Sequence, residues 1–162
     1  MKFNFSRLIP VLLLISVGCQ STRESDSMVD KIRLQDLNGK AINLNDYKGR
    51  TVFVNVWATW CKPCIEEMPS IKAAQVILNA KNIEFLFASD EEKERIESFA
   101  SKRKLDLQYV QLQNTEELQI QALPMTYIIN GEGDLVFSES GYRKWDDPSN
   151  IELLTKIIED NE

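Results

Sequence analysis

The segment that decides the fold is TVFVNVWATWCKPC, residues 51–64. Its first part, Thr51–Trp57, is mostly β-branched or aromatic, which is typical of a central strand buried on both faces. Cys61 and Cys64 follow with a proline between them, and we expect a helix from about Lys62 to Ala80. A buried strand that passes directly into a helix at two cysteines predicts an α/β domain with its chemistry at that junction.

The spacing of the two cysteines favours redox chemistry. Two sulfurs in the first turn of a helix can close a disulfide with little backbone movement. Cys61 would lie at the helix start, where free amides and the helix dipole favour a negative charge, and Lys62 adds a nearby cation. Attacking cysteines in such pairs have pKa values of about 3.5–7.5, against about 8.5 for free cysteine. Pro63 is tolerated in a first turn and stiffens it. From the geometry of the helix start we expect Cys61 to be the exposed attacking thiol and Cys64 the inward, resolving thiol.

Counts of two residue types exclude several other kinds of site. The chain has three cysteines and no histidine, so it has no Ser–His or Cys–His catalytic pair and no histidine metal ligand. A structural zinc site usually takes four Cys or His ligands, and Cys19 belongs to a targeting segment. We therefore expect no metal and no cofactor. The alternatives to a redox pair are a structural disulfide and two inert buried thiols.

The sequence on both sides of the cysteines also predicts alternating strands and helices. Asn38-Gly39 between apolar runs predicts a hairpin with a two-residue loop. Ser89 and Glu92 have the spacing of a capping box and predict that a helix begins there, with the acidic run at 91–94 as a solvated helix start of no assigned function. Pro148 opens a last helix. Apolar runs predict four further strands: Ile83–Ala88, Leu107–Leu112, Met125–Ile129 and Leu135–Ser138. The sum is a central mixed sheet with helices on both faces.

The N-terminal part of the chain predicts export. Residues 1–18 have a basic start and a short apolar run, too short to span a bilayer, which needs about 20 apolar residues. A small residue followed by Cys19 resembles the lipobox of bacterial lipoproteins, so we expect a signal peptide and an acylated Cys19; an ordinary cleaved signal is the alternative. Residues 19–30 are polar and predict a flexible tether, followed by one domain at 31–162.

The net negative charge of the chain makes nucleic acid an unfavourable partner. The formal net charge is −6, and without residues 1–18 it is −8, with 17 basic and 25 acidic side chains. Such a surface repels phosphate backbones.

Motifs beyond the cysteines identify a family resemblance. They are DLNGK at 36–40, LNDYKG at 44–49, EMP at 67–69, LPMTYII at 123–129, and Gly141 with Trp145-Asp146. With the CxxC segment they cover residues 31–160 and resemble the thioredoxin superfamily, more narrowly its TlpA/ResA-type branch of membrane-anchored, extracytoplasmic thiol–disulfide oxidoreductases. The resemblance implies a thioredoxin-like fold with an added N-terminal hairpin. It also implies disulfide-bearing protein substrates, such as apocytochrome c, and a membrane reductase that supplies electrons.

The resemblance also assigns roles to residues outside the cysteine pair. Asn55 occupies the place of a buried aspartate in thioredoxins and cannot accept a proton, and the branch places that role on Glu67. We expect Glu67 to be partly buried beside Cys64 with a raised pKa, and Glu66 to be solvated. Pro124 should follow a cis peptide bond, although only about 5–6% of X-Pro bonds in folded proteins are cis.

Two more residues are expected at the substrate-binding surface. The cis-proline loop should present the Leu123 backbone to a substrate strand and keep metal away from the sulfurs. Trp60 should be exposed beside Cys61.

Three other functions remain open at this point. A disulfide-forming oxidase would have a reduction potential nearer about −120 mV than about −270 mV. A peroxidase is disfavoured because the Pro-x-x-x-Thr-x-x-Cys pattern is absent around Cys61. A lipoprotein binding module with a structural disulfide would have no catalytic activity at all.

Overall fold

A seven-stranded mixed sheet forms the middle of the domain in the computed structural model, which describes residues 28–160. The strand order is β2-β1-β5-β4-β3-β6-β7. The three strands β5, β4 and β3 are parallel, and every other neighbouring pair is antiparallel. In chain order the elements are α1 (Met28–Lys31), β1 (Leu34–Asp36), β2 (Ala41–Ile42), η1 (Leu44–Tyr47), β3 (Thr51–Val56), α2 (Lys62–Ile77), β4 (Ile83–Ser89), α3 (Lys93–Arg103), β5 (Tyr109–Leu112), β6 (Met125–Ile129), β7 (Leu135–Ser140) and α4 (Pro148–Glu159).

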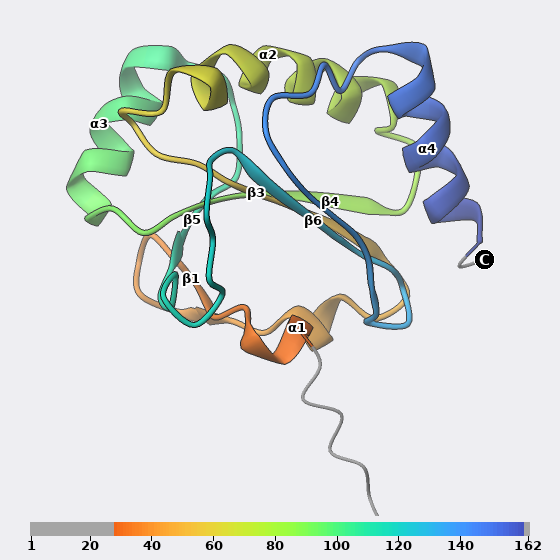
Figure 1. The fold of residues 1–162 in the computed structure, drawn as a ribbon, viewed down its shortest axis with the longest axis horizontal. Helices are drawn as coiled ribbons and strands as arrows, with labels where there is room; N and C mark the ends of the chain where they lie inside the picture. The colour runs from red at the N-terminus through yellow and green to blue at the C-terminus, as the bar shows by residue number, and fades with distance from the viewer. Residues whose placement is uncertain (1–27, 161–162) are drawn as a thin grey trace, which may run out of the picture.

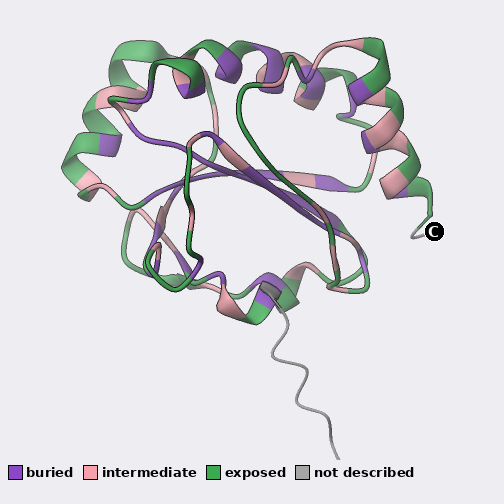
Figure 2. Cartoon of the chain, in the orientation of Figure 1, coloured by how far each residue is buried: buried purple, intermediate pink, exposed green. Residues whose placement is uncertain are grey.

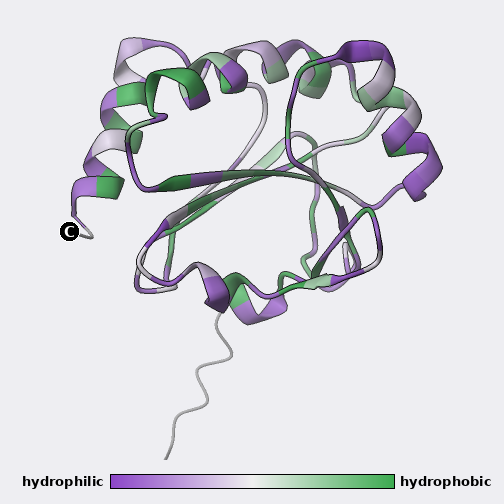
Figure 3. Ribbon diagram, turned by 180° about the vertical axis from the view of Figure 1, so that it is seen from behind, coloured by the Kyte–Doolittle hydropathy of each residue, from purple (hydrophilic) through white to green (hydrophobic). Residues whose placement is uncertain are grey.

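The central strand β3 is buried along its whole length, as its composition predicts. Figure 2 shows the central strands largely in the colour of buried residues, and Figure 3 shows the same strands as hydrophobic. Because side chains alternate along a strand, Phe53 and Asn55 face one layer of the domain, and Val52 and Val54 face the other. Asn55 is thus placed on the face that carries the helix after the cysteines.

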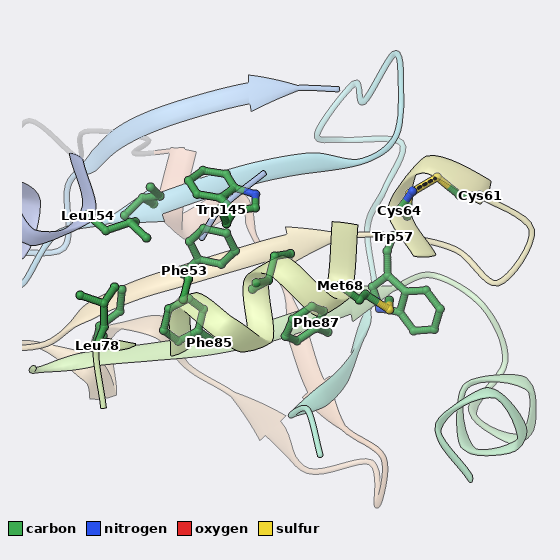
Figure 4. Close-up of a cluster of buried hydrophobic side chains, with 14 of the residues drawn as sticks. Phe53, Trp57, Cys61, Cys64, Met68, Leu78, Phe85, Phe87, Trp145 and Leu154 are labelled. Atoms are coloured by element: carbon green, nitrogen blue, oxygen red, sulfur yellow. Dashed lines mark hydrogen bonds between the residues drawn. A yellow bond between two sulfur atoms is a disulfide. The ribbon is translucent and has the colours of Figure 1, made fainter. Parts of the chain in front are cut away.

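The three long helices α2, α3 and α4 cover the same face of the sheet (Figure 1). They share one hydrophobic core, to which α2 contributes Met68, α3 contributes Ile96 and α4 contributes Leu154 (Figure 4 shows part of it). The opposite face is covered by short pieces, including α1 and η1, with buried residues such as Val29 and Leu44. The thioredoxin-like α/β class and the mixed sheet are therefore confirmed. Helices do lie on both faces, but the three long ones share one face and only the short α1 and η1 lie on the other.

Two local predictions differ from the structure. The hairpin is present, but Asp36 N–H donates to the Lys40 carbonyl across a three-residue loop in which Gly39 has φ of 83°. A type I turn followed by a left-handed residue is the usual three-residue solution, and glycine takes that conformation without strain. The capping box is wrong: Ser89 ends β4, and α3 begins only after Glu92, whose side chain makes no capping bond.

The part of the chain that precedes the domain lies outside the described residues. This holds for the export signal, for Cys19 and for most of the tether. Within residues 28–160, none of the helices has both the length and the hydropathy that a membrane span requires.

Candidate active site

The two cysteines form a disulfide at the start of α2. Cys61 is the N-cap, with an extended backbone, and the Cys64 N–H donates to Cys61 Sγ at 3.3 Å (dashed in Figure 4). The two Cα atoms are 5.3 Å apart, well within the usual range for a disulfide. Once reduced, Cys61 Sγ would stay beside the free amides of the first turn, which stabilise a thiolate there.

The two sulfurs differ in their access to solvent. Cys64 is completely buried, and Cys61 is 4% exposed. Cys61 is the less buried of the two, but in the disulfide form it is nearly covered, whereas the sequence predicted an exposed thiol. Three neighbours line the surface around it: Trp60 is 72% exposed, and Lys62 and Pro63 also face solvent. The Lys62 ammonium lies 3.6 Å from the exposed Glu66 carboxylate.

The loop before β6 contains the expected cis peptide bond, between Leu123 and Pro124. Pro124 is buried, and its carbonyl accepts a hydrogen bond from Gly141 N–H at 2.8 Å, which ties the loop to the end of β7. Leu123 is half-buried, and it lines the same shallow hollow as Trp60. The structure thus brings the residue before the cis-proline into one hollow with Trp60, which directly precedes Cys61 in the chain.

Glu67 is fully buried one turn after Cys64. Its Oε1 accepts hydrogen bonds from Trp145 Nε1 at 2.7 Å and Asn55 Nδ2 at 3.3 Å, and its Oε2 accepts from Arg143 N–H at 3.2 Å. Burial raises the pKa of Glu67 from 4.5 to about 7, although these hydrogen bonds and the Arg143 charge act in the opposite direction. The burial is more complete than we expected, and the direction of the pKa shift agrees with the prediction.

Asn55 joins the central strand to this carboxylate. Its amide nitrogen donates to Glu67 Oε1 and also to Thr126 Oγ1 at 3.2 Å, while its oxygen has no hydrogen-bond partner among the described residues. An aspartate at this position would bring a second carboxylate within about 3.3 Å of Glu67, where both could not be ionised together. The neutral amide therefore leaves Glu67 as the single buried acid in this contact.

Glu91, to which the sequence pattern assigned no function, holds the turn before Cys61. The Glu91 carboxylate accepts hydrogen bonds from Thr59 N–H at 2.6 Å and from Thr59 Oγ1 at 2.8 Å, and Arg95 lies 3.2 Å away. Burial alone would raise the pKa of Glu91, but the Thr59 hydrogen bonds and Arg95 together hold it below 4.5. The carboxylate stays ionised and fixes the turn that positions Cys61. Its place in an acidic run concealed this role.

The described residues contain no group of three or more His, Cys, Asp or Glu side chains arranged to hold a metal ion. The polar groups that the structure brings together at the cysteines are instead one disulfide, one buried carboxylic acid and the donors around it. These groups suit thiol–disulfide exchange, in which a thiol loses its proton and its sulfur attacks a disulfide.

Comparisons with known proteins agree with this geometry. The sequence profile of the AhpC/TSA family matches residues 26–138. A protein of Geobacillus kaustophilus named thiol-disulfide oxidoreductase ResA is 36% identical over 106 residues, which are 63% of this chain and 61% of that protein. The chain therefore spans less than two thirds of that relative. A Bacillus cereus protein of the same name is 32% identical over 152 residues, covering 84% of this chain and 88% of the relative.

A solved structure shows the same fold. The crystal structure of the thioredoxin domain of a thiol-disulfide oxidoreductase from Bacteroides vulgatus superposes with a TM-score of 0.66 at 25% identity. The match covers 78% of this chain and 92% of that domain.

Proposed function

The chain belongs to the AhpC/TSA family and has a thioredoxin-like fold, and from this premise we propose that it is a thiol–disulfide oxidoreductase that reduces disulfides in other proteins. The observation that carries the proposal is the Cys61–Cys64 disulfide at the start of α2, beside an exposed tryptophan and a cis-proline loop. The relatives named thiol-disulfide oxidoreductase ResA support the same activity.

The proposed reaction uses the two cysteines in turn. The Cys61 thiolate attacks one sulfur of a substrate disulfide, the substrate S–S bond breaks, and one substrate thiolate leaves. Cys64, as a thiolate, then attacks Cys61 Sγ in the mixed disulfide. The second substrate thiolate leaves, and the Cys61–Cys64 bond forms. Two electrons have passed from the dithiol to the substrate, and another reductant must restore the dithiol.

Glu67 is the group best placed to handle the proton of Cys64. It lies one turn further along the same helix, and residues three positions apart share a helix face. With a pKa of about 7, its carboxylate can accept the Cys64 proton near neutral pH and its carboxylic acid can return it. Leu123 would offer its backbone to the substrate strand, and Trp60 its exposed ring.

A trapping experiment tests this function. We expect the wild-type protein to accelerate the reduction of insulin by dithiothreitol. We expect Cys64→Ser to accumulate a mixed disulfide with oxidised protein substrates, because Cys61 can attack but nothing resolves the product. Non-reducing electrophoresis and mass spectrometry would identify the trapped protein and the linking cysteine. No trapped species and no insulin reduction would reject the proposal, and a potential near −120 mV would indicate the oxidase instead.

Location and partners complete the proposal. We place the protein on the outer side of a bacterial membrane, anchored by a lipid on Cys19, with a membrane reductase as electron donor and apocytochrome c among its substrates. The supports are the signal-like residues 1–18 and the resemblance to the TlpA/ResA-type branch.

The anchor gives a separate prediction. We expect Cys19 to be the acylated first residue of the mature protein and to take no part in exchange. Mass spectrometry of the membrane fraction should show a lipid-modified N-terminal cysteine, and Cys19→Ala should release the protein from membranes while its insulin reduction stays unchanged. A mature protein that starts elsewhere and remains soluble would contradict this prediction.

A further inference from the structure

The buried carboxylate of Glu67 is held chiefly by a residue 78 positions later in the chain. Trp145 lies in the segment between β7 and α4, is 1% exposed, and donates its indole N–H to Glu67 Oε1 at 2.7 Å. This is the shortest of the three hydrogen bonds to the carboxylate. Figure 4 shows the Trp145 ring packed on Phe53, with the ring nitrogen on the side that faces the cysteines.

The indole is fixed on several sides. Its ring packs edge-to-face against Phe53, with centroids 4.7 Å apart, and against Phe137 at 5.9 Å. Its main-chain N–H donates to Ser70 Oγ at 3.1 Å, and Ser70 Oγ donates to the Glu67 carbonyl at 2.8 Å. The Arg143 guanidinium lies 5.4 Å from the ring centroid. A ring held this firmly cannot turn its N–H away, so the donor is preorganised for the carboxylate.

We propose that Trp145 is a positioning residue for thiol–disulfide exchange, whose indole N–H orients the Glu67 carboxylate and favours its ionised form for the proton transfer with Cys64. This inference rests on the proposed function. In the step concerned, the Cys64 S–H bond breaks and its proton passes to a Glu67 oxygen. The resulting Cys64 thiolate attacks Cys61 Sγ, and the substrate thiolate leaves with the electron pair of the broken S–S bond. No further reactant is needed.

The surroundings of Glu67 leave few other groups that could set its protonation. From β3 the polar side chain that contacts Glu67 is Asn55, which is neutral and is itself bonded to the neutral Thr126 of β6. Arg143, from the same segment as Trp145, is the cation whose charge reaches the carboxylate. On α2, Cys64 lies one turn before Glu67 and becomes titratable once the disulfide is reduced. The indole N–H therefore supplies the strongest side-chain support for the charged form, and its removal should raise the pKa of Glu67.

Trp145→Phe tests the inference because it removes the N–H and keeps an aromatic ring. We expect the titration midpoint of the Glu67 carboxyl carbon, followed by NMR in the oxidised full-length protein, to rise by about one pH unit. We expect the midpoint in the pH profile of substrate release from the mixed disulfide to rise by the same amount. A purely structural role for Trp145 would change stability and leave both midpoints in place.

Three further variants separate the possible outcomes. Phe99→Leu disturbs ring packing in the same core, against Trp57 and Tyr109 rather than against Trp145, and should shift neither midpoint. In a Glu67→Gln background, Trp145→Phe should produce no pH shift. If Trp145→Phe does not fold, Ser70→Ala should loosen the indole and shift both midpoints in the same direction by less.

The carboxyl titration and the pH profile of substrate release also distinguish a failure of this inference from a failure of the proposed function. An unchanged carboxyl titration in Trp145→Phe overturns the inference, and so does a shifted titration with an unchanged pH profile. Absence of exchange in the wild-type protein would instead reject the proposed function, since the carboxyl titration does not depend on activity.

Discussion

Replacing Cys61 by Ser is expected to reduce insulin reduction to the rate of dithiothreitol alone. A serine hydroxyl does not ionise near neutral pH, so the first sulfur–sulfur attack cannot occur, and Cys64 is completely buried and cannot replace it. The measurement is the turbidity of precipitating insulin chains at pH 7, with thermal unfolding to establish that the variant is folded. This is the largest effect that we expect from any single substitution in the chain.

The matched control is Cys64→Ser, which keeps the attacking thiol. It should lose multiple turnover as well, but it should still form one mixed disulfide per molecule, whereas Cys61→Ser should form none. Equal insulin reduction by the wild-type protein and Cys61→Ser would mean that the disulfide is structural and that the chain is a binding module.

The sequence predicted the centre of this site because local patterns determine it. A doubly buried strand needs a nearly continuous apolar run, and a helix start tolerates proline, so β3, the cysteines and the beginning of α2 follow from adjacent residues. The cis bond before Pro124 was predictable only through the family resemblance, since composition alone favours trans.

The long-range contacts of the site left no signal in the sequence. Trp145 was noted as part of a motif, but its hydrogen bond to Glu67 joins segments 78 residues apart. Glu91 resembled other residues of a charged helix start, yet it supports Thr59 across 32 positions. The position of α2 and α3 on one sheet face follows from the strand order, in which β3, β4 and β5 are consecutive parallel neighbours. Parallel neighbours joined by right-handed crossovers in the same direction place both helices on one face.

These contacts explain how a carboxylic acid can be buried one helical turn after the disulfide. Burial raises the pKa of Glu67, whereas three donors from β3 and the β7–α4 segment and the Arg143 charge act in the opposite direction, and the resulting pKa is about 7. A pKa of about 7 suits the proposed role, in which Glu67 accepts and returns a proton near neutral pH. The segment between β7 and α4 thus supplies two of the three donors to the buried acid, although it lies far from the CxxC segment in the sequence.

Glu67→Gln should slow the resolution of the mixed disulfide by about 100-fold at pH 8, which is the usual contribution of a positioned general base. The amide oxygen can still accept from Trp145 and Asn55, but the amide cannot take up the Cys64 proton. The difference from the wild-type protein should narrow below pH 7, where Glu67 is itself protonated. Rapid-quench measurement of substrate release from a preformed mixed disulfide, across pH 6–9, gives this profile.

The same substitution has an effect on stability whose sign is fixed by the direction of the pKa shift. The folded protein holds a proton on Glu67 up to about pH 7, whereas the unfolded chain loses it near pH 4.5. The stabilisation is therefore fully present below pH 4.5 and is lost as the pH rises through about 7, a loss of about 3 kcal/mol in the free energy of unfolding. The free energy of unfolding can be measured by urea unfolding at a series of pH values. In Glu67→Gln it should no longer fall between pH 4.5 and 7, whereas Glu66→Gln, at the exposed neighbouring position, should keep the wild-type pH dependence. If Glu67→Gln matches the wild-type protein in both exchange rate and pH slope, Glu67 is not the proton acceptor and the Cys64 proton must leave through water.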